Sequence, residues 1–342
     1  MKNVVIIAEA GVNHNGDINL AKRLIDLGAE AGVDYVKFQT WVTELLLDKE
    51  APKAEYQKTN DGELTSQFEM LKQLELSYDD FIELNRYSNE KGVGFLSTPD
   101  EERSLDFLTD TLKLPILKIG SGEITNIPFL RKVGKKNKDV ILSTGMSTLG
   151  DVERAYNTLI DSGAKSVALL HCTSNYPAAY NSVNLRAMNT LATAFKTRIG
   201  YSDHTEGISV SLAAVALGAE IIEKHFTLDR KMQGPDHKAS MSPEELKMLV
   251  KEIRVVEEAM SGSGLKRIQS SEISTREVVL KGLYFNKDIE KGSLITEEIL
   301  IGKRPNNEIS ALDIDKCIGK KLKRDVTEGQ PIKWRDIDFE ED

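Results

Sequence analysis

The stretch PILKIGSGEIT (115–125) places Lys118 inside a short apolar run that is otherwise typical of a buried strand. The stretch VDYVKFQT (33–40) repeats the pattern with Lys37. Burying an ammonium group is costly unless an anion meets it. The two stretches therefore predict either that both lysines reach the protein surface or that they face a negatively charged group. The fold decides between these alternatives.

Both stretches belong to a set of short apolar runs, each followed by a longer amphipathic stretch. The runs span residues 4–10, 33–39, 93–98, 116–121, 140–144, 167–171, 198–203 and 220–226. They do not alternate cleanly between apolar and polar residues, which is typical of parallel strands buried on both faces. Eight β–α units within about 250 residues predict an α/β fold, a (β/α)8 TIM barrel. A long insert is expected over residues 41–92.

The helical patterns between the runs agree with this fold. Residues 19–32 carry leucines on one face and end in a glycine. Residues 151–163 also end in a glycine and begin at Asp151, which is the expected N-cap. Residues 208–218 are expected to form an apolar helix.

The composition changes after the barrel, which we expect to span residues 1–260. Residues 261–275 are rich in glycine and serine and are expected to form a linker. Residues 276–342 contain short β-rich runs broken by turns, so they predict a small, mostly β domain. A domain of fewer than about 70 residues has a thin core, and we therefore expect it to dock on another surface.

Composition also excludes some classes of function. The chain has 342 residues, 40% of them hydrophobic, and a net charge of −9, so a broad basic surface for nucleic acid is not expected. Cys172 and Cys317 have no metal-binding spacing and suit a reducing compartment. No targeting segment and no apolar run of about 20 residues is visible, so we expect a cytoplasmic protein without a membrane partner.

Polar residues stand near the ends of the predicted strands. In a barrel of this type the active site lies at the carboxyl ends of the strands, so these residues should meet on one rim. They are Glu9, Lys37, Gln39, Ser97, Thr98, Lys118, Ser121, Ser143, Thr144, His171, Ser202, Asp203, His204, Glu223 and His225.

The lysine pair predicts an anion site on that rim. With Ser121, Ser143, Ser202 and the backbone N–H groups of the Gly-Ser-Gly segment, Lys37 and Lys118 could hold a small dianion such as a phosphate monoester. The alternative is that each lysine extends its ammonium group to the surface or pairs with a carboxylate.

The histidine pair suggests a metal site. His204 and His225 come from neighbouring strands, and two imidazoles with free positions for water or substrate oxygen can hold a divalent cation, Mn2+ or Mg2+. The alternative is that both histidines are hydrogen-bonded structural residues. Local chemistry assigns no role to the three remaining histidines, which are His14, His171 and His237.

Glu9 lies inside an apolar strand, so its carboxylate must be paired, linked to a metal or protonated. In a functional role it could coordinate metal-bound water, steer a proton or contact a substrate hydroxyl. The structural alternative is a salt bridge to Lys37 across adjacent strands.

Ten short motifs occur in a fixed order along the chain. They are IAEAGVNHNG (7–16), VKFQT (36–40), LSTP (96–99), LKIGSGEI (117–124), LSTGMST (142–148), LLHCTSNYP (169–177), GYSDHTEG (200–207), EKHFTLD (223–229), GPDHKASM (234–241) and KRP (303–305). In this order the set resembles the sialic acid synthase family, which includes bacterial N-acetylneuraminate synthases and close relatives for legionaminic acid. The resemblance covers residues 7 to about 330. It implies a barrel followed by an antifreeze-like (SAF) domain, in a domain-swapped homodimer where the small domain of one subunit covers the barrel mouth of the other.

The resemblance implies that phosphoenolpyruvate condenses with N-acetylmannosamine to give a nine-carbon 2-keto acid and phosphate. By similarity, His204 and His225 hold the metal, which polarises the aldehyde of the open-chain sugar. The enol carbon attacks this aldehyde, water adds to the resulting cation, and phosphate leaves. An alternative acceptor is 2,4-diacetamido-2,4,6-trideoxymannose, which would make the protein an N,N'-diacetyllegionaminate synthase.

The resemblance also assigns individual roles. Glu9 would position metal-bound water or the C1 oxygen of the sugar, and Arg304 would reach the N-acetyl group across the dimer. The resemblance also implies two sets of binding residues. Phosphoenolpyruvate would be bound by Lys37, Lys118, Ser121, Ser143 and Ser202. The sugar would be bound by Gln39, Tyr176 and Asp236. The chain reads RPNNE where members often read RPGNG, so the resemblance leaves the exact contact of Arg304 open. Ser174 stands where some members carry asparagine, and no role is carried over to it.

Three other functions are alternatives to this one. A related synthase acting on a phosphorylated sugar would need an additional basic cluster, and none is obvious in the sequence. A non-catalytic sugar-binding barrel would be indicated by the loss of a metal histidine or an anion-site lysine, and none is lost. The third is a sister enzyme of pseudaminic acid synthesis.

Overall fold

The computed structural model describes residues 3–52 and 66–339. The chain forms two compact units, Met1–Ser261 and Gly262–Asp342. Part of the expected insert, residues 53–65, lies outside the described residues.

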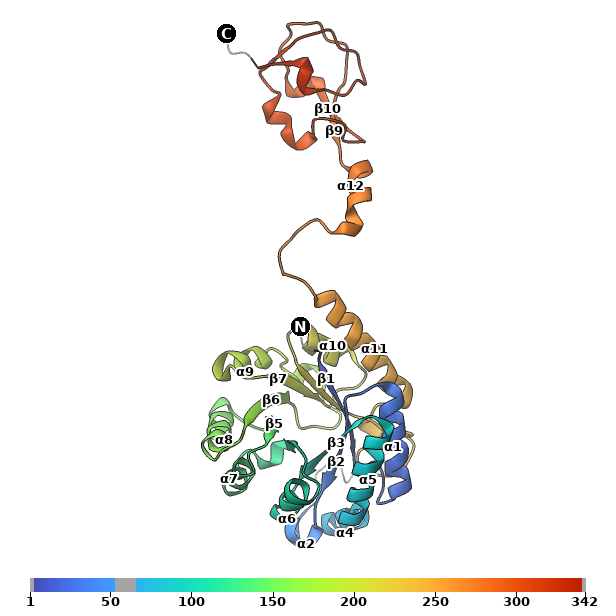
Figure 1. Ribbon diagram of the computed structural model, residues 1–342, viewed down its shortest axis with the longest axis vertical. Coiled ribbons are helices and arrows are strands. Elements are labelled where there is room, and N and C mark those ends of the chain that lie inside the picture. The colour runs from blue at the N-terminus through green and yellow to red at the C-terminus, as the bar shows by residue number, and fades with distance from the viewer. Residues whose placement is uncertain (1–2, 53–65, 340–342) are drawn as a thin grey trace. The chain divides into compact units, whose positions relative to one another are not determined.

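The large unit is built on eight parallel strands in the order β3-β2-β1-β8-β7-β6-β5-β4, and the two outermost strands of this order also lie side by side. Figure 1 shows the strands surrounded by helices. The predicted (β/α)8 barrel is therefore confirmed, and each predicted run overlaps one of its strands. The strands are β1 (Val5–Gly11), β2 (Tyr35–Thr40), β3 (Gly94–Pro99), β4 (Ile116–Ile119), β5 (Asp139–Ser143), β6 (Ser166–Cys172), β7 (Ile199–Asp203) and β8 (Ile221–His225).

Helices follow the strands along the chain. They are α1 (Ile18–Ala31), α2 (Thr43–Leu46), α4 (Gln67–Leu74), α5 (Tyr78–Lys91), α6 (Glu102–Asp106) with a π-helical turn (Phe107–Thr111), α7 (Ile127–Lys135), α8 (Leu149–Asp161), α9 (Ala187–Phe195), α10 (Ser209–Ala216) and α11 (Pro243–Met260). Short 3-10 helices occupy Ser121–Glu123, Tyr180–Ser182 and His237–Ala239.

The start of α8 differs from the prediction. Thr148, not Asp151, is the N-cap, and its hydroxyl accepts a hydrogen bond from the Asp151 backbone N–H. The Asp151 carboxylate in turn accepts from the backbone N–H of Thr148. This reciprocal capping box satisfies two free N–H groups at once, which a single cap at Asp151 would not do.

The barrel has two separate apolar layers. Most of the core lies between the strands and the surrounding helices. A smaller cluster fills the barrel interior, with Ile7, Leu96, Ile141, Ala168, Leu170 and Ile221. Side chains two positions apart on a strand share a face. The side chains two residues after Ile7, Ile141 and Ile221, which are those of Glu9, Ser143 and Glu223, therefore point into the barrel above this cluster.

The small unit has its own core, in which Leu283, Phe285 and Ile332 are fully or almost fully buried. Two antiparallel strand pairs form it, β9 (Gly282–Phe285) with β10 (Leu300–Lys303) and β11 (Lys321–Leu322) with β12 (Ile337–Asp338). Before β9, and still within the small unit, the segment expected to be a linker contains a 3-10 helix (Ser270–Glu272) and the start of α12 (Ile273–Val279).

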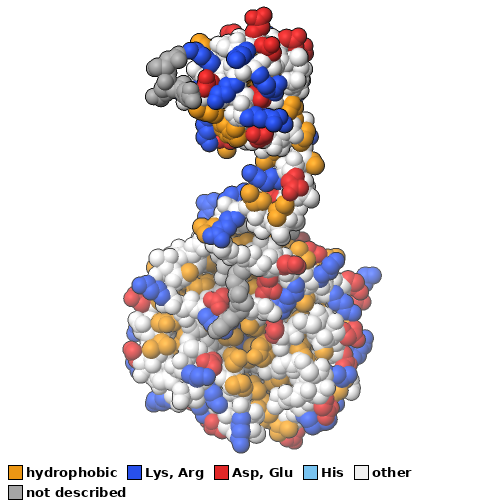
Figure 2. Space-filling view, turned by 45° about the horizontal axis from the view of Figure 1, so that its top comes forward, with side chains coloured by type: hydrophobic (Ala, Val, Ile, Leu, Met, Phe, Trp, Pro, Cys, Tyr) orange, Lys and Arg blue, Asp and Glu red, His pale blue; other side chains and the backbone are white. Residues whose placement is uncertain are grey.

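Acidic and basic side chains are mixed over the face shown in Figure 2. Within the described residues, no helix is both long and apolar enough to cross a membrane.

A glycine in β7 tests the packing of the barrel interior. A Cβ at Gly200 would lie 2.3 Å from the carbonyl oxygen of Ile221 and 2.6 Å from the Leu170 side chain. Gly200→Ala should therefore lower the free energy of unfolding by about 1–3 kcal/mol or more through overpacking. Thermal denaturation of the full chain would show this as a Tm several degrees lower.

The matched control is Gly150→Ala at the start of α8, where a Cβ would lie 3.9 Å from its nearest neighbour, Thr148 Oγ1. Alanine favours a helix over glycine by up to about 1 kcal/mol, so the Tm of this variant should stay the same or rise. Equal Tm values for the two variants would contradict the close contact at Gly200.

Candidate active site

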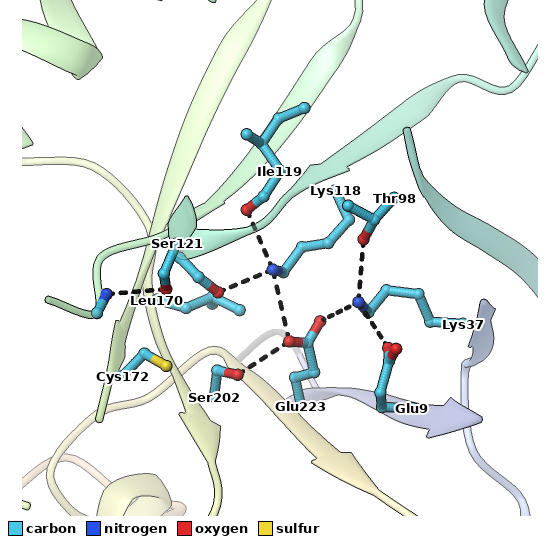
Figure 3. A network of polar contacts seen from close by, with 12 residues as sticks. Glu9, Lys37, Thr98, Lys118, Ile119, Ser121, Leu170, Cys172, Ser202 and Glu223 are labelled. Carbon is cyan, nitrogen blue, oxygen red and sulfur yellow. Dashed lines mark hydrogen bonds and ion pairs between the residues drawn. The ribbon is translucent and has the colours of Figure 1, made fainter. Parts of the chain in front are cut away.

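The two lysines that open the sequence analysis point into the barrel. Lys37, on β2, is 4% exposed, and Lys118, on β4, is 2% exposed. Figure 3 shows their ammonium groups turned toward one another around a shared carboxylate. Of the two alternatives left open, extension to the surface is excluded and pairing with carboxylates is observed.

The shared carboxylate is Glu223, on β8. Its Oε2 lies 3.5 Å from Lys37 Nζ, and its Oε1 lies 3.5 Å from Lys118 Nζ. Ser202 Oγ donates a hydrogen bond of 2.9 Å to Glu223 Oε1. Glu223 was expected near a strand end, but no role was predicted for it. Its position two residues after the inward-facing Ile221 was the available signal.

A second carboxylate completes the charge balance. Glu9 Oε2 lies 2.6 Å from Lys37 Nζ, so the salt bridge considered from the sequence is present. Lys37 Nζ also donates to Thr98 Oγ1 at 3.1 Å. Two ammonium groups and two carboxylates therefore share the buried mouth of the barrel, and no net charge is buried when all four are ionised.

The charges of these four groups shift one another's pKa values. Burial raises the pKa of Glu9 to about 7, although Lys37 opposes the rise. Burial also acts to raise the pKa of Glu223, but the ammonium groups of Lys118 and Lys37 outweigh it and lower this pKa to about 2. Glu223 is thus the permanent anion between the lysines, and Glu9 is the carboxyl group that can take up a proton near neutral pH.

The predicted anion-binding serines lie around Lys118. Its Nζ donates to Ser143 Oγ at 2.8 Å and to the carbonyl oxygen of Ile119 at 3.2 Å. Ser121 Oγ accepts from the backbone N–H of Gly145 at 2.9 Å. Figure 3 shows Ser121 and Ser202 on the same rim as both lysines. The structure therefore brings together the residues assigned to the anion site.

The two histidines of the predicted metal pair are neighbours, with ring centroids 5.5 Å apart. His204 Nδ1 lies 2.9 Å from the carbonyl oxygen of Thr173, which can only accept, so Nδ1 carries a hydrogen, and in the neutral ring Nε2 has a free lone pair. His225 Nδ1 is buried without a hydrogen-bond partner. Burial lowers the pKa of His225 well below its usual value, which keeps the ring neutral.

This donor set fits a divalent cation with open coordination positions. Neutral imidazoles are metal ligands, and an unpartnered buried nitrogen is a reason to expect a group that fills it. Among residues 3–52 and 66–339, no three His, Cys, Asp or Glu side chains are grouped as a ready ligand set. The histidine pair would therefore leave several ligand positions to water or substrate.

Two of the residues assigned to the sugar, Tyr176 and Asp236, lie beside the histidines. The Tyr176 ring centroid is 4.0 Å from that of His204 and 5.7 Å from that of His225. Asp236 Oδ2 lies 3.8 Å from His225 Nδ1, and burial raises the pKa of this carboxyl to about 6. Gln39 Nε2 donates a long hydrogen bond of 3.4 Å to Glu9 Oε1.

Arg304 lies in the small unit, just after β10, and its side chain is exposed. Its assigned contact with the sugar stays a prediction. His171, which had no assigned role, donates from Nε2 to the carbonyl oxygen of Val183 at 2.7 Å and stacks on Tyr201.

A cavity of about 600 Å³ opens on the same rim, next to the ends of β3 and β4. Asp100, Arg103, Glu123 and Asn126 contribute polar groups to its lining, and Leu45 and Phe129 contribute apolar ones. Burial raises the pKa of Asp100 to about 7, against the opposing charge of Lys37. Asp100 follows the last residue of β3 and was not among the residues predicted for the site.

Comparison with known proteins gives matches over nearly the whole chain. The model of the NeuB family matches residues 24–266, and that of the SAF domain matches residues 281–338. The chain is 50% identical to the N,N'-diacetyllegionaminic acid synthase of Campylobacter jejuni, over 97% of this chain and 100% of that protein. It is 47% identical to the enzyme of the same name from Legionella pneumophila, over 97% of this chain and 94% of that one.

A solved structure gives the same picture. The N-acetylneuraminic acid synthetase of Leptospira borgpetersenii, crystallised with citrate, is 37% identical and matches with a TM-score of 0.70. The match covers 80% of this chain and 90% of that one.

The raised pKa of Glu9 makes a prediction about stability. Because the folded-state pKa is raised from 4.5 to about 7, the folded protein holds a proton that the unfolded chain has already released between these values. The contribution of Glu9 to stability must therefore fall as the pH rises through this window. Glu9→Gln cannot ionise, so its Tm should decrease less than that of the wild type between about pH 5 and pH 7.5.

Glu220→Gln is the matched control, because Glu220 pairs with Arg198 on the surface and its side chain is 44% exposed. This variant should keep the wild-type dependence of Tm on pH. If Glu9→Gln also kept it, Glu9 would not be the group that takes up the proton.

Proposed function

The chain belongs to the NeuB family and carries a SAF domain, and from this we propose that it is an N,N'-diacetyllegionaminic acid synthase. The reaction class, phosphoenolpyruvate-dependent synthesis of a nine-carbon 2-keto acid, is that of the family. The acceptor is the proposal, and the observation that carries it is the identity of 50% and 47% to two enzymes of that name. The sequence alone led to N-acetylmannosamine as the first choice of acceptor, and the comparisons favour the alternative.

We assign the phosphate of phosphoenolpyruvate to the rim around Lys118. Lys118, Ser121, Ser143 and Ser202 come from four different elements and offer an ammonium group and three hydroxyls. Phosphate oxygens accept hydrogen bonds from both kinds of group, and charge-assisted bonds of this kind are the strong ones. Lys37, on the other side of Glu223, supplies the second positive charge.

We assign the sugar to the rim around the histidine pair. His204 and His225 would hold Mn2+ or Mg2+, which when bound would act as a Lewis acid on the aldehyde oxygen of the acceptor. Tyr176 and Asp236 lie against the two imidazoles, so they can orient the chain of the sugar. The two substrates then meet between β1 and β8, where Glu9 lies.

Glu9 is the proton-transfer group in this scheme. It contacts Lys37 on the phosphate side and Gln39 on the sugar side. With a pKa of about 7 it can give a proton to the sugar C1 oxygen as the bond forms between that carbon and C3 of phosphoenolpyruvate. Water then adds to C2 and the C–O bond to phosphate breaks, with Lys118 and the serines in place to stabilise the leaving dianion.

We also propose a domain-swapped homodimer in the cytoplasm. Apolar side chains of the small unit are strongly exposed, among them Leu265 at 60%, Val278 at 61% and Leu312 at 89%. Exposed apolar groups of this kind favour burial against another surface. Arg304 would then reach the sugar of the partner subunit. The two free cysteines, Cys172 and Cys317, fit a reducing compartment.

The deciding measurement is phosphate release from phosphoenolpyruvate with Mn2+ and equal concentrations of two acceptors, N-acetylmannosamine and 2,4-diacetamido-2,4,6-trideoxymannose. The proposal expects the higher kcat/KM with the second sugar. A higher value with the first would make the protein an N-acetylneuraminate synthase. Release with neither would contradict both assignments, and the pseudaminic acid precursor would be tried next.

The assignment of Lys118 to the phosphate site predicts that its loss changes the KM for phosphoenolpyruvate and not the KM for the sugar. Lys118→Ala should raise the KM for phosphoenolpyruvate by roughly tenfold to a hundredfold, the range expected for a lost charge-assisted hydrogen bond. The KM for the sugar should change little, because Lys118 is not among the residues around the histidines.

Lys224→Ala controls for the loss of a buried lysine as such. Lys224 is 3% exposed, but it pairs with Asp203 and donates to the Thr205 carbonyl oxygen. This variant should lose stability without shifting one KM relative to the other. Equal changes of both KM values in Lys118→Ala would argue against its place in the phosphate site.

A further inference from the structure

Two asparagines of the motif IAEAGVNHNG have no role in the proposed reaction. Asn13 and Asn15 lie in the loop after β1. Both side chains contact residues 226–240, which follow β8 and carry Asp236. The two loops lie more than 200 residues apart in sequence, yet adjacent strands bring them together, because β1 pairs with β8 in the barrel.

Asn15 joins two points of the β8 loop. Its Nδ2 donates to the carbonyl oxygen of Gln233 at 2.9 Å, and its Oδ1 lies 3.1 Å from His237 Nε2. The carbonyl fixes the orientation of the amide, so Oδ1 must face the histidine and His237 Nε2 must donate. His237 Nδ1 is then free to accept from Thr227 Oγ1, 2.6 Å away. One tautomer of His237 satisfies all these contacts.

The side chain of Asn13 is linked to the backbone of Asp236 through one other residue, Ser240. Its Nδ2 donates to the Phe226 carbonyl oxygen at 2.8 Å and to Ser240 Oγ at 2.9 Å. Ser240 Oγ in turn donates to the carbonyl oxygen of Asp236 at 2.7 Å. Asn13 and Ser240 are both completely buried, so water cannot replace these bonds if one partner is removed.

The loop lies so close to Asn15 that one position requires glycine. Gly234 has φ of +145°, and a Cβ there would lie 2.8 Å from Asn15 Oδ1 and 2.8 Å from His237 Cδ2. The segment is thus closely packed onto the asparagines as well as hydrogen-bonded to them. Asp236, two residues further on, is placed with its carboxylate 3.8 Å from His225 Nδ1.

We propose that Asn13, Asn15 and His237 are positioning residues that hold Asp236 against His225 for contact with the acceptor sugar. They act on the loop and not on the substrate. The inference rests on the proposed function, because the sugar contact of Asp236 is part of it. The same network joins β1, which carries Glu9, to the loop after β8. The bonds of Asn13 in this network are buried, and the bond of Asn15 to Gln233 is exposed.

The first experiment compares KM values in the full chain with the acceptor preferred by the wild type. His237→Ala should raise the KM for the sugar by about tenfold or more, since small displacements of orienting groups have effects of this size. The KM for phosphoenolpyruvate should stay within about twofold. His237→Gln should recover most of the loss, because its amide nitrogen can donate to Asn15 Oδ1 in place of Nε2.

Asn19→Ala is the matched control for Asn15→Ala. Asn19 is exposed in the first turn of α1, outside the network. Asn15→Ala should show the same split between the two KM values as His237→Ala, and Asn19→Ala should behave like the wild type. Equal changes of both KM values in Asn15→Ala and His237→Ala would indicate general loss of structure and overturn the inference.

A double-mutant comparison tests whether His237 acts through Asp236. If it does, His237→Ala should add almost nothing to the rise in sugar KM that Asp236→Ala causes by itself. If the two substitutions instead had fully additive effects on the free energy of sugar binding, the inference would be overturned, because His237 would then act independently of Asp236.

Hydrogen exchange without substrates separates this inference from the proposed function. The amides of Ala239 and Ser240 donate to the carbonyl oxygens of Asp236 and His237 within the loop. Asn15→Ala should accelerate their exchange, and Asn19→Ala should not. Unchanged exchange in Asn15→Ala would overturn the inference even if the enzyme used the expected sugar.

Two further outcomes would distinguish a failure of the link between Asp236 and the sugar from a failure of the proposed function. Faster exchange in Asn15→Ala, together with a sugar KM that Asp236→Ala leaves unchanged, would show that the loop is held as inferred. It would overturn the link from Asp236 to the sugar. If the wild type released no phosphate with any acceptor, the proposed function would fail, and exchange alone would decide whether the asparagines hold the loop.

Discussion

The barrel mouth depends on the two ion pairs that the Glu223 carboxylate makes with the ammonium groups of Lys37 and Lys118. Both lysines are almost completely buried, and two unpaired positive charges at this depth would disfavour the folded state by several kcal/mol. Glu223 and Glu9 balance them. The apolar cluster below stops where these four side chains begin, so the same charges mark the boundary between the packed interior and the reactive rim.

The charge balance links stability to function. In the proposed reaction the phosphate of the substrate meets an environment already occupied by carboxylates, so its binding is helped when Glu9 is protonated. The pKa of Glu9, raised to about 7 by burial, makes this protonated form accessible near neutral pH. A network that neutralises the buried lysines before substrate arrives is thus also one that can exchange a proton when substrate binds.

In the proposed assignment the rim has two halves, which meet at β1 and β8. The half that we assign to the phosphate is built from β4, β5 and β7 with their loops. The half that we assign to the sugar is built from the histidines, Tyr176 and the loop that carries Asp236. Glu9 and His225 are register partners on the adjacent strands. The hydrogen bonds of Asn13 and Asn15 extend this pairing beyond the strand ends into the loops. The pairing of β1 with β8 that closes the barrel therefore also places the loop that carries Asp236.

The sequence by itself determined the barrel, because strand and helix periodicity and the terminal glycines of helices are local properties that can be read over a few residues. It also indicated that Lys37, Lys118, His204 and His225 would meet, since all of them stand near the carboxyl ends of predicted strands. Only the tertiary structure decided that Glu223 bridges the lysines and that Asn15 faces His237. It likewise showed that Thr148 caps α8 where Asp151 was expected. For the first two, the reason is that strand register and side-chain direction select partners far apart in the chain. For the cap, Thr148 and Asp151 are both residue types that favour an N-cap, and the two reciprocal hydrogen bonds between them decide that Thr148 is the cap.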